Sequence, residues 1–297
     1  MSMRIVKLKG GLGNQMFQYA FAKLLEQTTG EEVVLDYSAY GSLKNDLVRV
    51  PRIKKFDLSL REATKKEIKE VCFFSHTSDS QSVIYRSKVY LEKTLNKRYY
   101  WEPDRAYRSI QDLQNYLYYD GYWQSWRYVK EVKEKLIADF KPNYDLSLNT
   151  RNMMSQMSTE DAIFVGVRRG DYLKEITHYG SFSSDYYLRA MHFVAEHCNK
   201  PVFYVFSNDI EWCKENISWK GYDVRFRFPE LQTDDFEELL LMASCKHAII
   251  VNSSYNWWGA ELISNPEKII CCPHRWWFDD KPIDIIPDEW RKMKGVL

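Results

Sequence analysis

At 297 residues, with a net charge of +1 and an isoelectric point near 7.6, the chain suits two domains or one large one and lacks the basic excess of proteins that bind nucleic acid or anionic membranes. No apolar run approaches the roughly 18 residues of a membrane span, and the N-terminus MSMRIVKLKG lacks a signal-peptide core. We therefore expect at most peripheral membrane association. The six cysteines show no CxxC spacing, which favours reduced core thiols in a cytoplasmic protein over disulfides or a zinc site.

The first elements predict a strand–helix–strand unit. Residues 4–9 are typical of a strand, residues 10–13 (GGLG) of a tight turn, residues 14–28 of a helix with one apolar face, and residues 32–36 of a second strand. Backbone amides at the start of such a helix bind anions well. A nicotinamide-binding fold is one hypothesis, but the third glycine position of its fingerprint is occupied by Met16.

The middle of the chain is rich in aromatic residues. Residues 36–60 look irregular, residues 61–71 and 129–140 are predicted helices, and aromatic side chains gather at 99–101 and 116–128. Residues 141–159 are polar and contain Pro142, which is typical of a domain boundary. We therefore predict domains at 1–155 and 156–297.

Strands and helices alternate in the second half, which predicts a parallel sheet and an α/β fold. The predicted strands are residues 163–167, 202–206, 224–228, 247–251 and 268–271. The predicted helices are one that starts at Asp185, a short one that ends near Asn216, and two over residues 234–244 and 253–263.

One buried strand ends in charged residues. In FVGVRRGDY (residues 164–172), Arg168 and Arg169 follow the strand, and Asp171 follows them. Ligands of open α/β sheets bind at the carboxyl ends of the strands, and guanidinium groups bind phosphate oxygens in pairs, so this segment predicts a phosphate or pyrophosphate site. The alternative is an Arg–Asp pair that only stabilises a turn.

Four stretches, in this order, resemble glycosyltransferase family 11, the α-1,2-fucosyltransferases that use GDP-L-fucose. They are GGLGNQMFQYAFAKLL (10–25), VRRGDYL (167–173), FSNDIEWCKEN (206–216) and DDFEELLLMASCKHAIIVNSSYNWWGAEL (234–262). The resemblance implies two Rossmann-like domains facing a cleft (the GT-B type), with the nucleotide sugar held by the C-terminal domain. It also implies an enzyme that transfers L-fucose, with inversion, to the 2-hydroxyl of a galactose-terminated glycan.

The same resemblance assigns expected roles to individual residues. The donor would face the turn and first helical residues of the N-terminal domain, Gly11, Gly13, Asn14 and Gln15. Guanine would bind to one of two acids, Glu238 or Asp235. Phosphate oxygens would be held by the arginines and by a polar triplet before a helix, Asn252, Ser253 and Ser254. The alternatives remain an ordinary strand–helix turn, helix-start acids without a ligand, and simple helix capping by the serines.

The reaction expels GDP, so negative charge develops on its β-phosphate. No two aspartates in the sequence are two positions apart, so the DxD motif of metal-dependent enzymes is absent and no metal or other cofactor is expected. Arg168 is the first candidate to stabilise the charge, with Arg169 in support. A general base is not assigned. Asp171, which could instead orient the arginines, His178 and Asp36 are candidates.

Two further expectations concern the family pattern and the acceptor. The family usually carries His two positions before the first arginine, where this chain has Gly166. We expect a histidine introduced there to be tolerated or to tighten GDP binding. The aromatic residues 116–128, among them Tyr122 and Trp123, are the candidate acceptor platform, whereas Trp257 and Trp258 could stack on a sugar or pack in the core. The alternatives to fucosyl transfer are another GDP-sugar or linkage, or a non-catalytic nucleotide- or glycan-binding protein.

Overall fold

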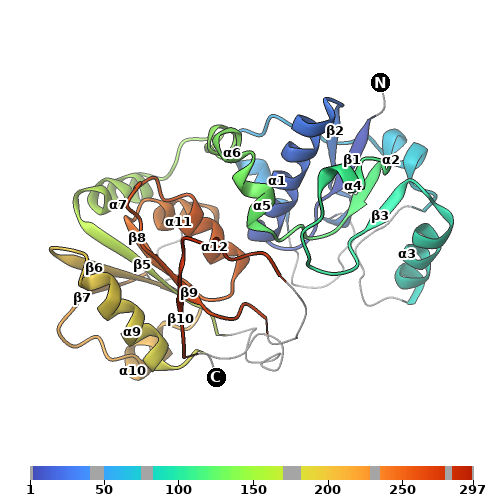
Figure 1. Cartoon of the computed structure of the whole chain (residues 1–297). Coiled ribbons are helices and arrows are strands. Elements are labelled where there is room, and N and C mark those ends of the chain that lie inside the picture. Colours follow the sequence, from blue (N-terminus) through green and yellow to red (C-terminus); the bar gives the residue numbers. More distant parts are fainter. Residues whose placement is uncertain are drawn as a thin grey trace. The chain divides into compact units, whose positions relative to one another are not determined.

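The computed structural model describes residues 3–40, 50–74, 83–169, 182–227, 235–277 and 283–295. The chain divides into two compact units (Figure 1). Unit 1 comprises Met1–Tyr144 and Lys281–Ile285, and unit 2 comprises Asp145–Asp280 and Ile286–Leu297. Each unit is an α/β domain built on a parallel sheet, so the predicted fold class of two Rossmann-like domains is confirmed.

The sheet of unit 1 has the order β2-β1-β4-β3, and every neighbouring pair is parallel. Its strands are β1 (Arg4–Lys7), β2 (Val33–Asp36), β3 (Tyr99–Trp101) and β4 (Tyr118–Asp120). Both faces are covered, as parallel sheets require. On one face Ile5, Val34 and Tyr118 belong to a buried cluster with residues from α2 (Lys65–Val71). On the other, Phe21 of α1 (Leu12–Thr29) packs edge-on against Tyr119.

Helix α1 has clear sequence signals at both ends. It begins after Gly11, and it ends at Gly30, which takes the left-handed conformation (φ 67°) and donates its N–H to the carbonyl of Glu26 at 2.9 Å. Helix α2 starts four residues later than predicted because Thr64 and Glu67 form a capping box. Both helices were predicted, α1 from its apolar face and α2 as a charged helix.

The middle of unit 1 differs most from the sequence-based prediction. The two aromatic clusters become strands β3 and β4, because aromatic residues suit a pleated surface that is covered on both sides. The single helix predicted over 129–140 is two short ones, α5 (Trp126–Lys130) and α6 (Lys133–Asp139). Helices α3 (Val83–Leu95) and α4 (Ile110–Leu113) complete the unit and were not predicted.

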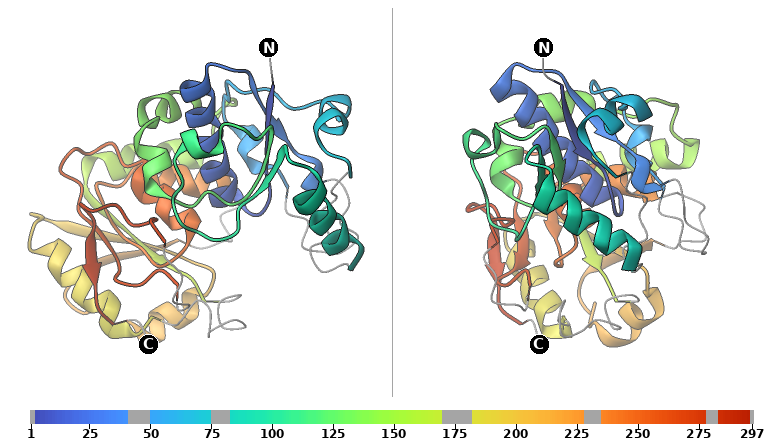
Figure 2. Two further views of the ribbon diagram at one scale, coloured as in Figure 1. Left: turned by 45° about the vertical axis from the view of Figure 1, so that its right-hand side comes forward. Right: turned by 90° about the vertical axis from the view of Figure 1, so that its right-hand side faces the viewer.

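The sheet of unit 2 has the order β10-β9-β8-β5-β6-β7, again parallel throughout (Figure 2). Its strands are β5 (Asp161–Val167), β6 (Pro201–Ser207), β7 (Asp223–Arg227), β8 (His247–Ile249), β9 (Ile270–Pro273) and β10 (Arg291–Met293). The first five were predicted within a few residues. β10 was missed because its charged residues give no apolar signal.

Side chains alternate between the two faces of β5. Ile163, Val165 and Val167 pack against α9 (Ser184–Ala195) and α10 (Ile210–Asn216) in one buried cluster. The opposite face of the sheet carries α7 (Leu148–Thr159), α11 (Asp235–Ala243) and α12 (Ser254–Glu261). Alternation therefore directs Gly166 and Arg168 toward this second helical layer.

The division between the units falls at Tyr144/Asp145, eleven residues before the predicted boundary. Residues 148–159, predicted as part of a polar linker, form α7 and belong to unit 2. The side chain of Ser147 caps α7 and also donates to Glu237 of α11 at 2.7 Å. These polar contacts hold α7 to its own unit, and no apolar pattern in the sequence signals them.

Within the described residues, no helix combines the length and the apolar character that crossing a membrane would need. All six cysteines lie in described segments as free thiols, and all but Cys198, which is half-buried, are buried.

Candidate functional site

The strand order of each unit contains a point where the chain reverses direction across the sheet. In unit 2 the chain runs from β5 outward to β7 and then returns to β8 on the other side of β5. Ligands of open α/β sheets bind outside the carboxyl ends of the two strands at such a point. Those ends carry Arg168 after β5 and Asn252–Ser254 after β8. The topology therefore brings these sequence-predicted residues to one edge of the sheet.

Tyr255, in the first turn of α12, links the other predicted residues of unit 2. Burial raises the pKa of its hydroxyl well above the usual value; Glu238 and Asp235 act in the same direction, and Arg168 opposes them. Its hydroxyl also donates a hydrogen bond to the main-chain oxygen of Asp235. The charges of Arg168, Asp235 and Glu238 thus all act on the pKa of the Tyr255 hydroxyl.

The polar triplet before α12 has two structural members. Ser253 is the helix cap, and its Oγ accepts the N–H of Asn256 at 3.5 Å. Asn252 is 1% exposed and donates through Nδ2 to the carbonyl of Trp276 at 2.8 Å. Ser254 is only partly buried. Capping therefore accounts for one contact of Ser253. The main-chain N–H groups in the first turn of α12 point along the helix axis toward the carboxyl ends of the strands.

Arg169 does not share the environment of Arg168. Its main-chain N–H donates to Asn208 at 3.0 Å, and its Nε lies 3.4 Å from a carboxylate oxygen of Asp209. Its guanidinium carbon lies 3.8 Å from the centre of the Trp212 ring. All three partners belong to the turn into α10 and to α10 itself. The contacts place Arg169 on the α10 side of the sheet, whereas alternation along β5 directs Arg168 toward the side that carries α12.

Gly166 lies directly beneath Asn256 of α12. A Cβ built on Gly166 would come within 2.7 Å of the Asn256 Cγ and Oδ1 atoms and within 2.8 Å of Nδ2. These distances are far below van der Waals contact, so any side chain at position 166 must displace the Asn256 carboxamide. A histidine introduced there would have to displace this side chain, and the expectation that it is tolerated stays a prediction.

The sequence also suggested two candidate bases and two sugar-stacking residues in unit 2. Asp171 and His178 lie outside the described residues. Trp257 and Trp258 are at most 1% exposed and pack edge-on at 5.0 Å, and Trp257 also packs against Trp290. This pair is core, so the alternative of stacking on a sugar is wrong for both.

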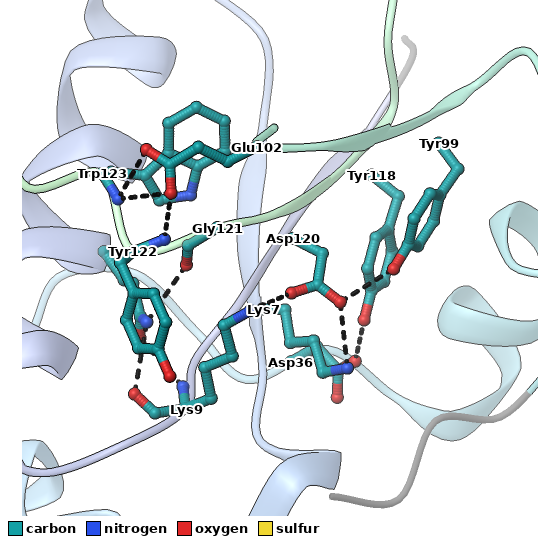
Figure 3. A network of polar contacts seen from close by, with 11 residues as sticks. Lys7, Lys9, Asp36, Tyr99, Glu102, Tyr118, Asp120, Gly121, Tyr122 and Trp123 are labelled. Atoms are coloured by element: carbon teal, nitrogen blue, oxygen red, sulfur yellow. Dashed lines mark hydrogen bonds and ion pairs between the residues drawn. The ribbon is translucent and has the colours of Figure 1, made fainter. Parts of the chain in front are cut away.

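Unit 1 has its own reversal point, between β1 and β4. Asp120, fully buried at the end of β4, accepts from Lys7 Nζ at 3.1 Å and from Lys9 Nζ at 2.5 Å (Figure 3). Tyr99 donates to the same carboxylate at 2.7 Å. Burial disfavours the charged carboxylate, but Lys7 and Lys9 outweigh it and hold the pKa of Asp120 well below its usual range.

The turn from β1 into α1 is fixed by two buried glutamines. Gln15 donates to the carbonyls of Gly10 and Val50 and accepts from the N–H of Ile53. Gln18 donates to the carbonyls of Lys9 and Gly121, at 3.2 Å each, so it joins the ends of β1 and β4. The side-chain bonds of Gln15 all go to main-chain groups of its own unit, which indicates a positioning role rather than ligand contact.

Asn14 differs from Gln15. It is only partly buried, and its Oδ1 accepts from Gln124 Nε2 at 2.7 Å. Gly11 is exposed, with open space where a Cβ would point, whereas Gly13 is buried in the first turn. The N-terminus of α1 therefore presents Gly11 and Asn14 at the β1/β4 edge.

The predicted aromatic platform separates into a core residue and a surface residue. Trp123 is 1% exposed and stacks on Phe21 with ring centres 3.8 Å apart. Tyr122 is 43% exposed, and Lys9 Nζ lies 4.8 Å from the centre of its ring. Glu102 supports the turn that carries both residues, because its carboxylate accepts the N–H of Tyr122 at 2.6 Å (Figure 3). Burial raises the pKa of this carboxyl. Tyr122 is therefore the member of the pair that can meet a ligand.

Asp36 is a poor candidate for a general base. It is 1% exposed, and its carboxylate accepts from the N–H of Ser38 at 2.7 Å, from the Ser38 hydroxyl at 3.0 Å and from the Tyr118 hydroxyl. With three donors bound and almost no exposed surface, the group has a structural role.

Sequence reasoning missed five residues at these two edges: Lys9, Glu102, Asp120, Gln124 and Asn256. Lys9 and Asp120 follow strands whose adjacency appears only in the tertiary topology. The aromatic pattern around 116–128 hid the strand end at Asp120. Asn256 faces Gly166 across ninety residues, and only the pairing of α12 with β5 reveals the contact.

Among the described residues, no group of three or more His, Cys, Asp or Glu side chains is arranged to hold a metal ion. This finding does not test whether the reaction needs a metal, so metal independence stays a prediction.

Comparisons with known proteins agree over almost the whole chain. Residues 2–291 match the model of glycosyl transferase family 11. An α-1,2-colitosyltransferase of Escherichia coli is 28% identical over 99% of this chain and 100% of its own length. Human galactoside α-(1,2)-fucosyltransferase 1 is 30% identical, over 50% of this chain and 43% of its own length.

A solved structure supports the fold. A mutant of Arabidopsis thaliana FUT1 in complex with GDP superposes with a TM-score of 0.52, covering 92% of this chain and 71% of its own at 12% identity. At that identity the likeness concerns the fold alone.

Proposed function

Because the chain belongs to glycosyl transferase family 11 and is a glycosyltransferase, we propose that it transfers L-fucose from GDP-L-fucose to the 2-hydroxyl of a terminal β-galactoside, with inversion and without a metal. The observation that carries the donor assignment is the edge of unit 2 between β5 and β8. Arg168 follows β5 there, and the N-terminus of α12 follows β8, at the point where the strand order reverses.

Charge explains the roles proposed for unit 2. Departure of GDP places negative charge on the β-phosphate, and the α12 first-turn amides and the Arg168 guanidinium are donors that suit it. Ser254 adds a hydroxyl on the same turn. Glu238, half-buried in α11, is the proposed acceptor for the N1–H and N2–H of guanine, with Asp235 as the alternative. These groups supply electrostatic stabilisation that a metal supplies in DxD enzymes.

Unit 1 is the proposed acceptor side. Tyr122 offers an exposed ring for the apolar face of a sugar, and the partly exposed Lys9 offers a hydrogen-bond donor beside it. Gln18 and Glu102 fix the main chain on which these residues lie. The free thiols support a reducing compartment, and we propose a cytoplasmic location.

A second candidate is transfer of colitose, which is L-fucose without its 3-hydroxyl. The full-length similarity to an α-1,2-colitosyltransferase favours it. Both donors would use the same nucleotide site, so the two candidates differ only at the sugar.

The test is GDP release from GDP-L-fucose and from GDP-colitose in EDTA, against lactose, N-acetyllactosamine and Gal-β1,3-GlcNAc. Galactoside-dependent release, with fucose on the galactose 2-hydroxyl of the product, is the expected result. Faster turnover of GDP-colitose would select the second candidate. Binding of GDP without stimulation by any acceptor would contradict the galactoside assignment.

A further inference from the structure

Asn256 is a buried polar side chain whose oxygen has no hydrogen-bond donor among the residues that the structure describes. The residue is 5% exposed, and no described residue donates a hydrogen bond to its Oδ1. A buried acceptor without a donor destabilises a fold, and native proteins contain few of them. A buried acceptor of this kind is available to a hydrogen-bond donor on a ligand.

The position of Asn256 connects it to the proposed donor site. It lies in the first turn of α12, where its N–H is capped by Ser253. Its carboxamide lies against Gly166, and Gly166 shares a strand face with Arg168, two residues further along. Asn256 is therefore within one turn of Ser254 on the helix and adjacent to the strand that delivers Arg168.

Gly166 is the other half of this arrangement. A glycine on β5 leaves space above the strand, and the Asn256 side chain fills it, with atoms 2.7–2.8 Å from where a Cβ would lie. A strand residue with a side chain would occupy the same volume itself. The hydrogen-bonding group at this place thus comes from α12 instead of from β5.

On this basis, and resting on the proposed function, we propose that Asn256 is a donor-recognition residue whose carboxamide oxygen accepts a hydrogen bond from the nucleoside half of the nucleotide sugar. Phosphate oxygens are acceptors and cannot bond to Oδ1, whereas ribose hydroxyls and guanine N–H groups are donors. The terminal torsion of an asparagine is broad, so the carboxamide can change the direction of its oxygen at low cost.

The first test compares stability and affinity in matched variants. Asn256→Ala removes the unpartnered oxygen, so the melting temperature should be unchanged or higher while GDP binds about tenfold more weakly. Asn96→Ala is the control, because Asn96 is also buried but donates to the carbonyl of Val71 at 2.7 Å and to Glu92 at 2.8 Å. That variant should melt at lower temperature with the GDP affinity of the wild type.

The second test identifies the contacted group. IDP lacks the exocyclic amine of guanine, and 2′-deoxy-GDP and 3′-deoxy-GDP each lack one ribose hydroxyl. The analogue that lacks the bonded donor should bind the wild type more weakly than GDP does, and this difference should disappear in Asn256→Ala.

The third test uses the steric coupling. Gly166→Ala should weaken GDP binding in the wild type, because the new Cβ displaces Asn256, and should have little further effect in the Asn256→Ala background. Equal GDP affinity of the wild type and Asn256→Ala would overturn the role of Asn256 and leave the proposed function intact. Failure of the wild type to bind GDP would overturn the proposed function, and this inference with it.

Discussion

The guanidinium of Arg169 lies over the Trp212 ring, with its central carbon 3.8 Å from the ring centre, and pairs with Asp209. Alternation along β5 directs its neighbour Arg168 to the opposite side of the sheet, where the charge of Arg168 acts to lower the pKa of Tyr255. Two adjacent arginines that look equivalent in the sequence therefore have different surroundings. Arg169 contacts residues of α10 and the turn before it, whereas Arg168 follows β5 at the edge where the residues proposed to bind phosphate lie.

The two arginines should respond differently to truncation. Arg168→Ala should lower kcat by roughly 10²–10³-fold, the usual cost of losing one group that stabilises developing charge, with little change in melting temperature. Arg169→Ala should lower the melting temperature through loss of the Trp212 and Asp209 contacts and reduce kcat less. Steady-state GDP release and thermal unfolding measure both. Activity of Arg168→Ala above a tenth of wild type would contradict the assignment.

Tyr122 and Trp123 should separate acceptor binding from folding. Trp123→Ala removes a core side chain that stacks on Phe21 and should cost about 3–5 kcal/mol of unfolding free energy. Tyr122→Ala should raise the acceptor KM at unchanged stability. Tyr90→Ala, which truncates another exposed tyrosine (66%), is the control. An unchanged acceptor KM in folded Tyr122→Ala would remove Tyr122 from the acceptor site.

Asn14 and Gln15 give a second adjacent pair with opposite expectations. Gln15→Ala loses three side-chain bonds to main-chain groups and should lower the melting temperature. Asn14→Ala loses the partly exposed bond to Gln124 and should reduce kcat/KM with a smaller change in stability. Combining Asn14→Ala with Gln124→Ala measures their coupling. Full activity in Asn14→Ala would show that this residue does not take part.

The buried Asp120 should contribute stability over most of the pH range. Lys7 and Lys9 lower the pKa of Asp120 in the folded state. The contribution to stability is therefore complete above the pKa of the unfolded state, about 4, and is lost as pH falls through the pKa of the folded state. Asp120→Asn should therefore unfold about 3–5 kcal/mol more easily at pH 7, because two lysines lose their counter-ion. Denaturant titrations between pH 3 and 8 should show this difference constant down to about pH 4 and smaller below. A difference that grows on acidification would refute the argument.

Chelation tests the absence of a metal requirement. GDP release in EDTA should equal the rate in Mg²⁺ or Mn²⁺, because Arg168 and helix amides are proposed to carry the charge of the leaving group. Restoration of a lost activity by a divalent ion, after chelation has abolished it, would show that a metal is required.

The sequence by itself determined the α/β class, most elements of unit 2 and the candidate phosphate residues. Local patterns suffice there, because a buried parallel strand is continuously apolar and its first polar residues lie at the ligand edge. Arg168 was identified in this way, and helix α1 was predicted to within two residues of its observed ends.

Only the tertiary structure decided which of these residues share a location. Strand order places Asp120 beside Lys7 and Lys9, and the alternation of β5 sends Arg168 and Arg169 to different layers. The packing of α12 on β5 explains Gly166, which the sequence shows only as a missing side chain. Such contacts join residues far apart in the chain, so no local period encodes them, and the function of each residue depends on the neighbour that the fold supplies.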